Sequence, residues 1–483
     1  MQPYHQTPDG ITLYHGHVLD VLASLPDESV HCAVTSPPYH GLRDYGLPPS
    51  IWDDPGDCEH QWDDWQEAHD EREPDAVAGK SRSTDRFYGD ESRRFNGNHQ
   101  KHTAGQFCRH CASWRGQLGL EPTVDAFVTH LVEVFRHVKR VLRSDGTCFL
   151  NIGDSYAGGG HGPTGKGSCI GNQDYEKRQG FVNRRTTPTD GLKPKDLCLV
   201  PFRLALALQA DGWWVRQTII WSKPNPMPES VVDRPTTSHE YIFLLAKAGN
   251  YFFNQDAVRE LQSPGTFERF GTHGRRTGIG PKQTNSPNGM IRDKATMAEA
   301  ILPNGRNIRS VWTTRTQATP EAHFATYPEE LVRRCLLAAS SERGVCPECG
   351  APWRRLVERK RSGVAWINPK SLITQTGGQT TPRLGPGIRD NIHTLGWTPS
   401  CRCNRPDTVP ATVLDPFAGS CTTLVVARQL GRRGIGIDLS ETYLRDIGIP
   451  RLEGQTPSLL ALPAAEPSRN GHACEQLALE ATT

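Results

Sequence analysis

Three residue types stand together near the N-terminus: the stretch Ser36-Pro37-Pro38-Tyr39 offers a hydroxyl, two prolines and an aromatic ring. Only Thr35 separates it from the apolar pair Ala33-Val34. Proline has no amide hydrogen to donate within a sheet, and it biases the residue before it away from helix. The stretch is therefore expected to be a stiff, extended piece of backbone at the end of a strand. It presents a serine and a tyrosine for chemistry but carries neither an acid nor a base.

A second stretch near the C-terminus has the pattern of a ligand-binding turn. A short apolar strand ends at Asp415, a turn containing Gly419 leads into a helix that begins near Thr422, and the next strand ends at Asp438. A small residue lets the backbone approach a ligand closely, and an acid at the end of the following strand suits ribose hydroxyls. The glycine pattern of a dinucleotide-phosphate loop is missing, which favours a different cofactor that contains a nucleoside.

The cysteines form two sets whose spacing is typical of zinc ligands. The chain has 14 cysteines, and most of those that are closely spaced frame two polar insertions. Each set supplies four soft ligands, the number that tetrahedral zinc takes in a structural site with no open position. His110 and His69 are alternatives to His60. The expected ligands are Cys58, His60, Cys108 and Cys111 in the first set, and Cys346, Cys349, Cys401 and Cys403 in the second.

The elements that must position these residues alternate between strands and helices. This alternation favours a parallel, doubly wound α/β sheet. In residues 125–156, apolar side chains at helical spacing predict a helix that extends to Leu142, then a turn at Ser144-Asp145-Gly146 and a buried strand. The other blocks of this kind are residues 10–39, 199–223, 238–248 and 411–440.

Composition sets weaker limits. The 483 residues include 55 Lys and Arg against 53 Asp and Glu, so net charge does not demand a nucleic-acid partner, and such a contact would need local patches. No run of about twenty apolar residues is present, and the N-terminus lacks the basic and apolar blocks of a signal peptide. The sequence therefore predicts a soluble, cytoplasmic protein with no membrane partner.

Two motifs, "TSPPY" at 35–39 and "LDPFAGSCTT" at 414–423, resemble those of the amino-group DNA methyltransferases that use S-adenosylmethionine. The motifs stand in the order catalytic loop first and cofactor loop last, which resembles the permuted β group of that family. Cys421 replaces a glycine that usually follows Gly-Ser, and His17 stands where the family often has an acid. Further similar blocks are "PDESVHCAV", "WSKPNPMPESVVDRPTTSHEYIFLLAKAGNYFFN", "HFATYPEELVRRCLLAAS" and "GIGIDLS".

The resemblance implies roles for the two motifs. The Ser36 oxygen and the Pro37 carbonyl would accept hydrogen bonds from an exocyclic amine, and the prolines would fix both acceptors in place. Tyr39 would stack on a base flipped out of the duplex. The implied catalytic residues are Ser36, Pro37, Pro38 and Tyr39, and the implied cofactor-binding residues are Asp415, Pro416, Phe417, Ala418, Gly419, Ser420, Thr422, Asp438, Phe324 and Thr326.

The resemblance also implies a substrate. Ser-Pro-Pro-Tyr is commoner among the cytosine-N4 enzymes and Asp-Pro-Pro-Tyr among the adenine-N6 enzymes, so Ser36 favours cytosine-N4 in double-stranded DNA, with adenine-N6 as the alternative. Methylation of RNA or of a protein amide is a further alternative. A catalytically inactive, zinc-containing DNA-binding protein is another. A cognate restriction endonuclease is a further expected partner, in a bacterial or phage-infected cell where the protein associates with the nucleoid.

The expected organisation is a class I methyltransferase, a Rossmann-like and mostly parallel sheet of seven strands, with zinc-binding insertions. Its catalytic domain is expected to consist of residues 1–46, 119–254, 319–345 and 405–451. The remaining parts are expected to be a zinc-binding insertion at 47–118, a target-recognition region at 255–318, a zinc-ribbon-like insertion at 346–404 and a flexible tail at 452–483. The target-recognition region could contact phosphates and base edges through Arg269, Arg275, Arg276, Lys282, Arg292, Lys294, Arg306 and Arg309.

Overall fold

The computed structural model describes residues 1–42, 44–63, 66–67, 103–157, 191–193, 195–260, 306–317, 327–361 and 390–454. The helices in these ranges are α1 (Val18–Ser24), α2 (Val124–Val141), α4 (Val200–Ala210), α7 (Glu329–Ala339), α8 (Thr422–Gln429), α9 (Glu441–Tyr443) and α10 (Ile449–Gly454), with a 3-10 turn at Gln255–Val258 and a π turn at Leu444–Gly448. The strands are β1 (His5–Gln6), β2 (Ile11–His15), β3 (Val30–Thr35), β4 (Ser50–Trp52), β5 (Gln66–Glu67), β6 (Thr103–Phe107), β7 (Trp114–Gly116), β8 (Leu142–Ile152), β9 (Trp214–Ser222), β10 (His239–Ala246), β11 (Val311–Thr313), β12 (Arg354–Arg361), β13 (Asp390–Thr398), β14 (Thr412–Asp415) and β15 (Arg433–Asp438).

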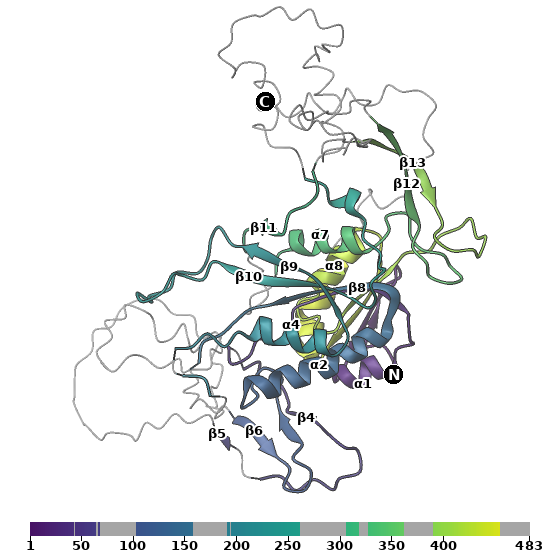
Figure 1. Cartoon of the computed structure of the whole chain (residues 1–483). Coiled ribbons are helices and arrows are strands. Elements are labelled where there is room, and N and C mark those ends of the chain that lie inside the picture. The colour runs from purple at the N-terminus through teal and green to yellow at the C-terminus, as the bar shows by residue number, and fades with distance from the viewer. Residues whose placement is uncertain are drawn as a thin grey trace, which may run out of the picture.

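One large sheet forms the centre of the molecule (Figure 1). Its strands lie in the order β1-β2-β15-β14-β3-β8-β10-β9-β11. The pairs from β2 to β8 are all parallel, and β10 runs antiparallel to both of its neighbours. The predicted doubly wound, mostly parallel sheet is confirmed. Within the described ranges the sheet has nine strands rather than seven, because β1 adds to β2 at one edge and β11 adds to β9 at the other.

The chain order defines where a ligand should bind. Helix α8 connects β14 to β15 on one side of the sheet centre, and α2 precedes β8 on the other side. The boundary between β14 and β3 is therefore the point at which the winding direction reverses. Open α/β sheets bind ligands outside the carboxyl ends of the strands at such a switch point. The Ser36–Tyr39 loop follows β3, and the Gly419 turn follows β14, so both predicted motifs stand at this edge.

Helices cover both faces of the sheet. Helices α1, α2 and α4 pack on one face, and α7 and α8 pack on the other (Figure 1). Strand β3 is buried on both sides: Ala33 belongs to the first core, whereas Cys32 and Val34 belong to the second. This alternation follows from the two-residue period of a strand. Burial on both faces explains why β3 carries three successive apolar residues, Cys32, Ala33 and Val34.

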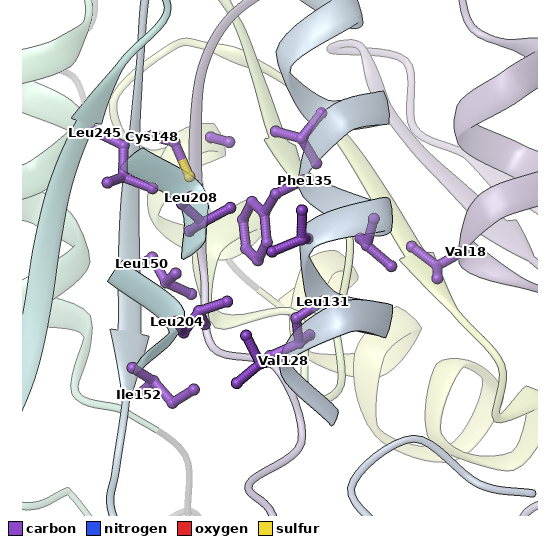
Figure 2. Packing of buried hydrophobic residues seen from close by; sticks show 14 of the residues in the cluster. Val18, Val128, Leu131, Phe135, Cys148, Leu150, Ile152, Leu204, Leu208 and Leu245 are labelled. Atoms are coloured by element: carbon purple, nitrogen blue, oxygen red, sulfur yellow. The ribbon is translucent and has the colours of Figure 1, made fainter. Parts of the chain in front are cut away.

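The larger core lies between β8 and the helices α2 and α4. Leu131 and Phe135 of α2 meet Leu204 and Leu208 of α4 over Leu150 of β8 (Figure 2). All five side chains are fully buried. Burying a Leu or Phe side chain contributes about 2 kcal/mol. The predicted helical spacing in residues 125–142 therefore identifies the face of α2 that packs against the sheet.

The junction between α2 and β8 differs from the prediction. The helix ends at Val141, and Leu142 already pairs with Val30 of β3, so no separate turn precedes the strand. The next paired residues are Cys32 and Thr147, so the pairing register shifts at this point. Ser144-Asp145-Gly146 therefore lies in an irregular part of β8. Turn-forming residues signal a break in regular pairing, and here the sheet accommodates that break as a bulge.

Smaller sheets occupy the insertions. Strands β4, β7, β6 and β5 form a four-stranded sheet, and β12 and β13 form a two-stranded one. In the region 255–318, β11 belongs to the large sheet, and Trp312 is buried there. Helix α10 continues to Gly454, past the expected start of the tail. Among the described residues, no helix is long and apolar enough to cross a membrane.

Candidate active site

The Ser36–Tyr39 loop begins where β3 ends, between β14 and β8. Pro37 is buried, and Ser36, Pro38 and Tyr39 are half-buried. The preceding residue, Thr35, donates a hydrogen bond of 2.7 Å from Oγ1 to Asp415 Oδ1 at the end of β14. The two predicted motifs, far apart in the sequence, are thus in direct contact.

Tyr39 is anchored at both its hydroxyl and its ring. The hydroxyl lies 2.8 Å from Glu240 Oε2, 3.2 Å from Asn151 Oδ1 and 3.4 Å from Ser36 Oγ. Burial and the adjacent Glu240 charge hold the pKa of Tyr39 well above its ordinary value, so the phenol keeps its proton. The ring edge lies against Gly153, where a Cβ atom would stand 2.5 Å from Tyr39 Cε2.

Gly153→Ala should therefore displace the Tyr39 ring. We expect about a tenfold lower methylation rate and a loss of about 1–3 kcal/mol of unfolding free energy from overpacking. Single-turnover methylation and denaturant unfolding would measure the two effects. Gly454→Ala is the matched control, because a Cβ atom there meets nothing within 4 Å. A Gly153→Ala enzyme with the wild-type rate would contradict the close packing.

Asp415 holds three segments together. Its side chain is 1% exposed. Besides Thr35, it accepts hydrogen bonds of 2.9 Å from the Tyr327 hydroxyl and 3.1 Å from the Phe417 amide. Burial raises the pKa of Asp415 even though these donors oppose the shift. The carboxylate therefore fixes the start of the predicted cofactor turn against both β3 and Tyr327, two residues before α7 begins.

The turn after Asp415 has the backbone geometry that suits close approach of a ligand. Gly419 has φ +48, and a Cβ atom there would approach only one atom, 4.0 Å away, so space is open beside it. Cys421 adopts φ +60, the left-handed conformation that favours glycine. Its thiol is buried, and a Cβ atom at Gly448 would stand 2.6 Å from the sulfur. The cysteine thus occupies the glycine position with its side chain packed inward, and α8 begins at Thr422.

Asp438 closes the other side of this turn. Its Oδ2 accepts a 2.7 Å hydrogen bond from the Gly419 amide, and its Oδ1 accepts one of 2.7 Å from the Ser440 amide. Burial raises the pKa of Asp438 to about 6. A carboxylate has about four lone pairs, so each oxygen keeps one lone pair for a further donor.

The remaining predicted cofactor residues divide into two groups. Pro416, Phe417, Ala418 and Ser420 belong to the same turn, with Ser420 Oγ 3.2 Å from Thr422 Oγ1. Phe324 and Thr326 lie outside the described residues. His17 stands at the N-cap position of α1 without a side-chain capping hydrogen bond, and its ring packs edge-on against Trp52, at 4.9 Å between ring centroids.

The first predicted metal set converges in the insertion. The ligand atoms of Cys58, His60, Cys108 and Cys111 all lie within 4.8 Å of one another. His60 Nδ1 is 3.4 Å from Cys111 Sγ, and its Nε2 is 3.4 Å from a carboxylate oxygen of Asp54. The alternative ligand His69 lies outside the described residues. The side chain of the other alternative, His110, is not part of this group.

The second predicted metal set also converges. The thiols of Cys346, Cys349, Cys401 and Cys403 lie within 4.8 Å of one another. The following residue, Gly350, turns back with its amide 2.9 Å from the Cys346 carbonyl.

This cysteine knuckle is tied to the main sheet. The Gly350 carbonyl lies 3.0 Å from Nε2 of His31 in β3. On the other side of the ring, Nδ1 accepts a 2.9 Å hydrogen bond from the Thr412 amide in β14. Burial and the nearby Arg143 lower the pKa of His31 to about 4, so a neutral imidazole links the knuckle to both strands of the switch point.

Of the predicted basic residues, Arg306 and Arg309 are described. Both guanidinium groups contact Glu260, at 2.9 and 3.1 Å. The other six lie outside the described residues.

Sequence reasoning missed several residues of the site, namely Asn151, Lys223, Glu240 and Tyr327. Glu240 and Asn151 lie at the facing ends of the antiparallel neighbours β10 and β8. No local spacing relates them to Ser36 or Tyr39. The one available signal was a polar residue at the end of an otherwise apolar strand, which occurs in "FLNIGD" and "SHEYIF".

A doubly wound sheet that carries a Ser-Pro-Pro-Tyr loop and a glycine turn at its switch point defines a class I methyltransferase. The chain belongs to the DNA methylase family of N6 and N4 amino-methyltransferases, whose family model matches residues 30–346 and 409–448.

Two sequence relatives agree with this assignment. Type II methyltransferase M.Cfr9I of Citrobacter freundii is 31% identical over 460 residues, covering 95% of this chain and 92% of that protein. Type II methyltransferase M.SmaI of Serratia marcescens is 31% identical over 428 residues, with 89% and 86% covered. Among solved structures, PvuII DNA methyltransferase (cytosine-N4-specific) matches with a TM-score of 0.41 and 12% identity, over 95% of this chain and 98% of that one.

Proposed function

We propose that this DNA methyltransferase transfers a methyl group from S-adenosylmethionine to the N4 amine of cytosine in double-stranded DNA. The observation that carries the proposal is the contact between the Ser36–Tyr39 loop and the Asp415 turn at the switch point. Adenine-N6 is the alternative target. Both bases offer an exocyclic amine, and the preference rests on serine rather than aspartate at the first position of the loop.

The Gly419 turn and Asp438 fit the nucleoside part of the cofactor. Each Asp438 oxygen keeps a lone pair that can accept a hydrogen bond from a ribose hydroxyl, and the space beside Gly419 is open. The methionine part would contact Phe324 and Thr326. When bound, S-adenosylmethionine supplies a methyl group on a sulfonium, which is electrophilic enough for an uncharged amine to attack.

The protein's part in the chemistry is to prepare the amine. The lone pair of an exocyclic amine is delocalised into the ring, so the nitrogen is a poor nucleophile. Hydrogen bonds from its two N–H groups to Ser36 Oγ and the Pro37 carbonyl favour a pyramidal nitrogen whose lone pair points out of the ring plane. The stiff loop supplies both acceptors without rearrangement, which is where the catalytic gain arises.

Asp438 should make cofactor affinity depend on pH. Its pKa of about 6 means that the carboxylate is protonated below that pH and loses acceptor capacity. Calorimetric affinity for S-adenosylmethionine should be constant above about pH 7 and fall about tenfold per unit below about pH 6. Asp438→Asn should bind at least about tenfold more weakly, without this pH dependence. Asp27→Asn, a surface control, should behave as wild type, and a flat wild-type profile would contradict the assignment.

We further propose that both metal sets hold structural zinc. Backbone amides donate to the thiols, from His110 and Cys111 to Cys108 and from Glu348 and Cys349 to Cys346, as thiolate ligands require. In the first set the Nδ1 side of His60 faces the thiols and its Nε2 faces Asp54, the arrangement by which a carboxylate orients a metal-bound histidine. Four protein ligands leave no open position, so each zinc would hold its insertion together.

Methylome sequencing tests the function directly. The protein is expressed in a methylation-free bacterial host, and long-read sequencing reports the modified base and its context. N4-methylcytosine at a fixed sequence is the expected result. Methylated adenine would instead support the adenine-N6 alternative. Unmodified DNA together with absent cofactor binding would favour an inactive DNA-binding protein. Methylation confined to RNA or protein would assign the other alternative.

Target recognition and partners follow from the same proposal. The basic region 255–318 would read the target sequence. A cognate restriction endonuclease would recognise the same DNA sequence, as the Type II names of the relatives suggest. Host DNA from the expression experiment should then resist an endonuclease of that specificity.

A further inference from the structure

The catalytic loop lacks an acid of its own, but the fold supplies one from β10. Glu240 Oε2 lies 2.8 Å from the Tyr39 hydroxyl and 3.1 Å from Asn151 Nδ2. Its other oxygen, Oε1, pairs with the Lys223 ammonium, which also lies 4.4 Å from the centre of the Trp221 ring. Both members of the ion pair are largely buried, with side-chain exposures of 20% for Lys223 and 17% for Glu240.

The charge of this acid determines the direction of a chain of hydrogen bonds. An ionised carboxylate can only accept. The Tyr39 hydroxyl has one proton and two acceptors within reach, Glu240 Oε2 at 2.8 Å and Asn151 Oδ1 at 3.2 Å, and the nearer, charged Glu240 takes it. The Tyr39 oxygen is then available as an acceptor, and the Ser36 hydroxyl donates to it over 3.4 Å. With its single proton committed to Tyr39, Ser36 presents only lone pairs to the substrate.

We propose that Glu240 is the positioning residue that makes Ser36 an obligatory hydrogen-bond acceptor toward the target amine, acting through Tyr39. The inference deepens the proposed function and rests on it for the identity of the substrate. A free serine hydroxyl can donate or accept. Donation to the amino nitrogen would engage the very lone pair that must attack the methyl group. Fixing the direction of the Ser36 hydroxyl removes that unproductive arrangement.

Glu240→Gln keeps a side chain of the same size and changes the direction of its hydrogen bond with Tyr39. Lys223 can only donate, so the glutamine carbonyl should turn toward Lys223 and its amide hydrogens toward Tyr39. The phenol then receives a hydrogen bond, and its own proton is shared between two uncharged acceptors, Asn151 Oδ1 at 3.2 Å and Ser36 Oγ at 3.4 Å, so no charge directs it away from Ser36. We expect kcat on a DNA duplex to fall about ten- to hundredfold, with affinities for S-adenosylmethionine and DNA within about twofold of wild type.

The matched control is Glu28→Gln. Glu28 also pairs with a lysine, Lys247, which directly follows the other end of β10, and it has no contact with Tyr39. This variant should keep the wild-type kcat. Equal losses in the two variants, or a wild-type kcat in Glu240→Gln, would overturn the inference.

A double-mutant cycle separates action through Tyr39 from a general structural effect. Tyr39→Phe removes the hydroxyl that links Ser36 to Glu240. Adding Glu240→Gln to it should then lower kcat no further, because the chain is already broken. Multiplicative losses would show that Glu240 acts elsewhere and would overturn the inference.

A spectroscopic measurement tests the same contact without methylation. In protein labelled with 3-fluorotyrosine, the fluorine resonance of Tyr39 is identified by its absence in Tyr39→Phe. It should shift in Glu240→Gln and stay in place in Glu28→Gln. An unshifted resonance overturns the inference. If the wild-type protein proves unable to methylate DNA, the proposed function fails, and this resonance alone decides whether Glu240 controls Tyr39.

Discussion

Replacing Ser36 by alanine should lower the methylation rate by about a hundredfold or more while leaving the protein folded. The side chain lies at the carboxyl end of β3, within 3.4 Å of the Tyr39 hydroxyl. Its oxygen is the side-chain acceptor proposed for the target amine. Removing one preorganised hydrogen-bond partner of a transition state costs about 10²–10³ in rate. Because the neighbouring prolines fix the backbone, alanine should leave the path of the loop unchanged.

Single-turnover transfer of labelled methyl groups to a DNA duplex measures this effect. Cofactor affinity and melting temperature should match the wild type, which places the loss in the chemical step. Ser29→Ala is a suitable control, since that hydroxyl bonds only the Pro26 carbonyl in an exposed turn. A Ser36→Ala enzyme with the wild-type rate would show that the loop is not the acceptor.

Removing one ligand of the second metal set should have the largest effect on stability. Cys346→Ser leaves three thiols, and zinc bound by four ligands contributes on the order of 10 kcal/mol to folding of small zinc units. Cys346 is 2% exposed. The knuckle also bonds His31, which bridges β3 and β14. We therefore expect a lower melting temperature and loss of activity, beyond local unfolding of the insertion.

Metal analysis of the purified protein gives a direct readout. The wild type should contain two zinc ions per chain, one for each set of four ligands, and Cys346→Ser should contain one. Cys198→Ser, at a buried thiol outside both sets, should retain two. A wild-type protein purified without chelators that holds no zinc would refute the structural assignment.

Most of the fold could be predicted because its signals are local. Apolar spacing in residues 125–142 identifies the buried face of α2, and the strand–turn–helix pattern places α8 at Thr422. The strand count and the α2–β8 junction could not be predicted in this way. The short edge strands have no periodicity of their own, and the bulge at Ser144–Gly146 depends on its pairing with β3.

The sequence by itself determined the two motifs, their order and the two sets of candidate metal ligands. Each motif, and each closely spaced half of a cysteine set, depends on residues a few positions apart, whose geometry local backbone conformation largely dictates. Only the tertiary structure decided which distant side chains complete the site. Tyr39 and Glu240 are 201 positions apart, and Tyr39 and Asn151 are 112 apart. They meet because β3, β8 and β10 are neighbours in the sheet, and strand order is a property of the whole fold. The acid missing from the Ser36–Tyr39 loop was therefore visible only after folding.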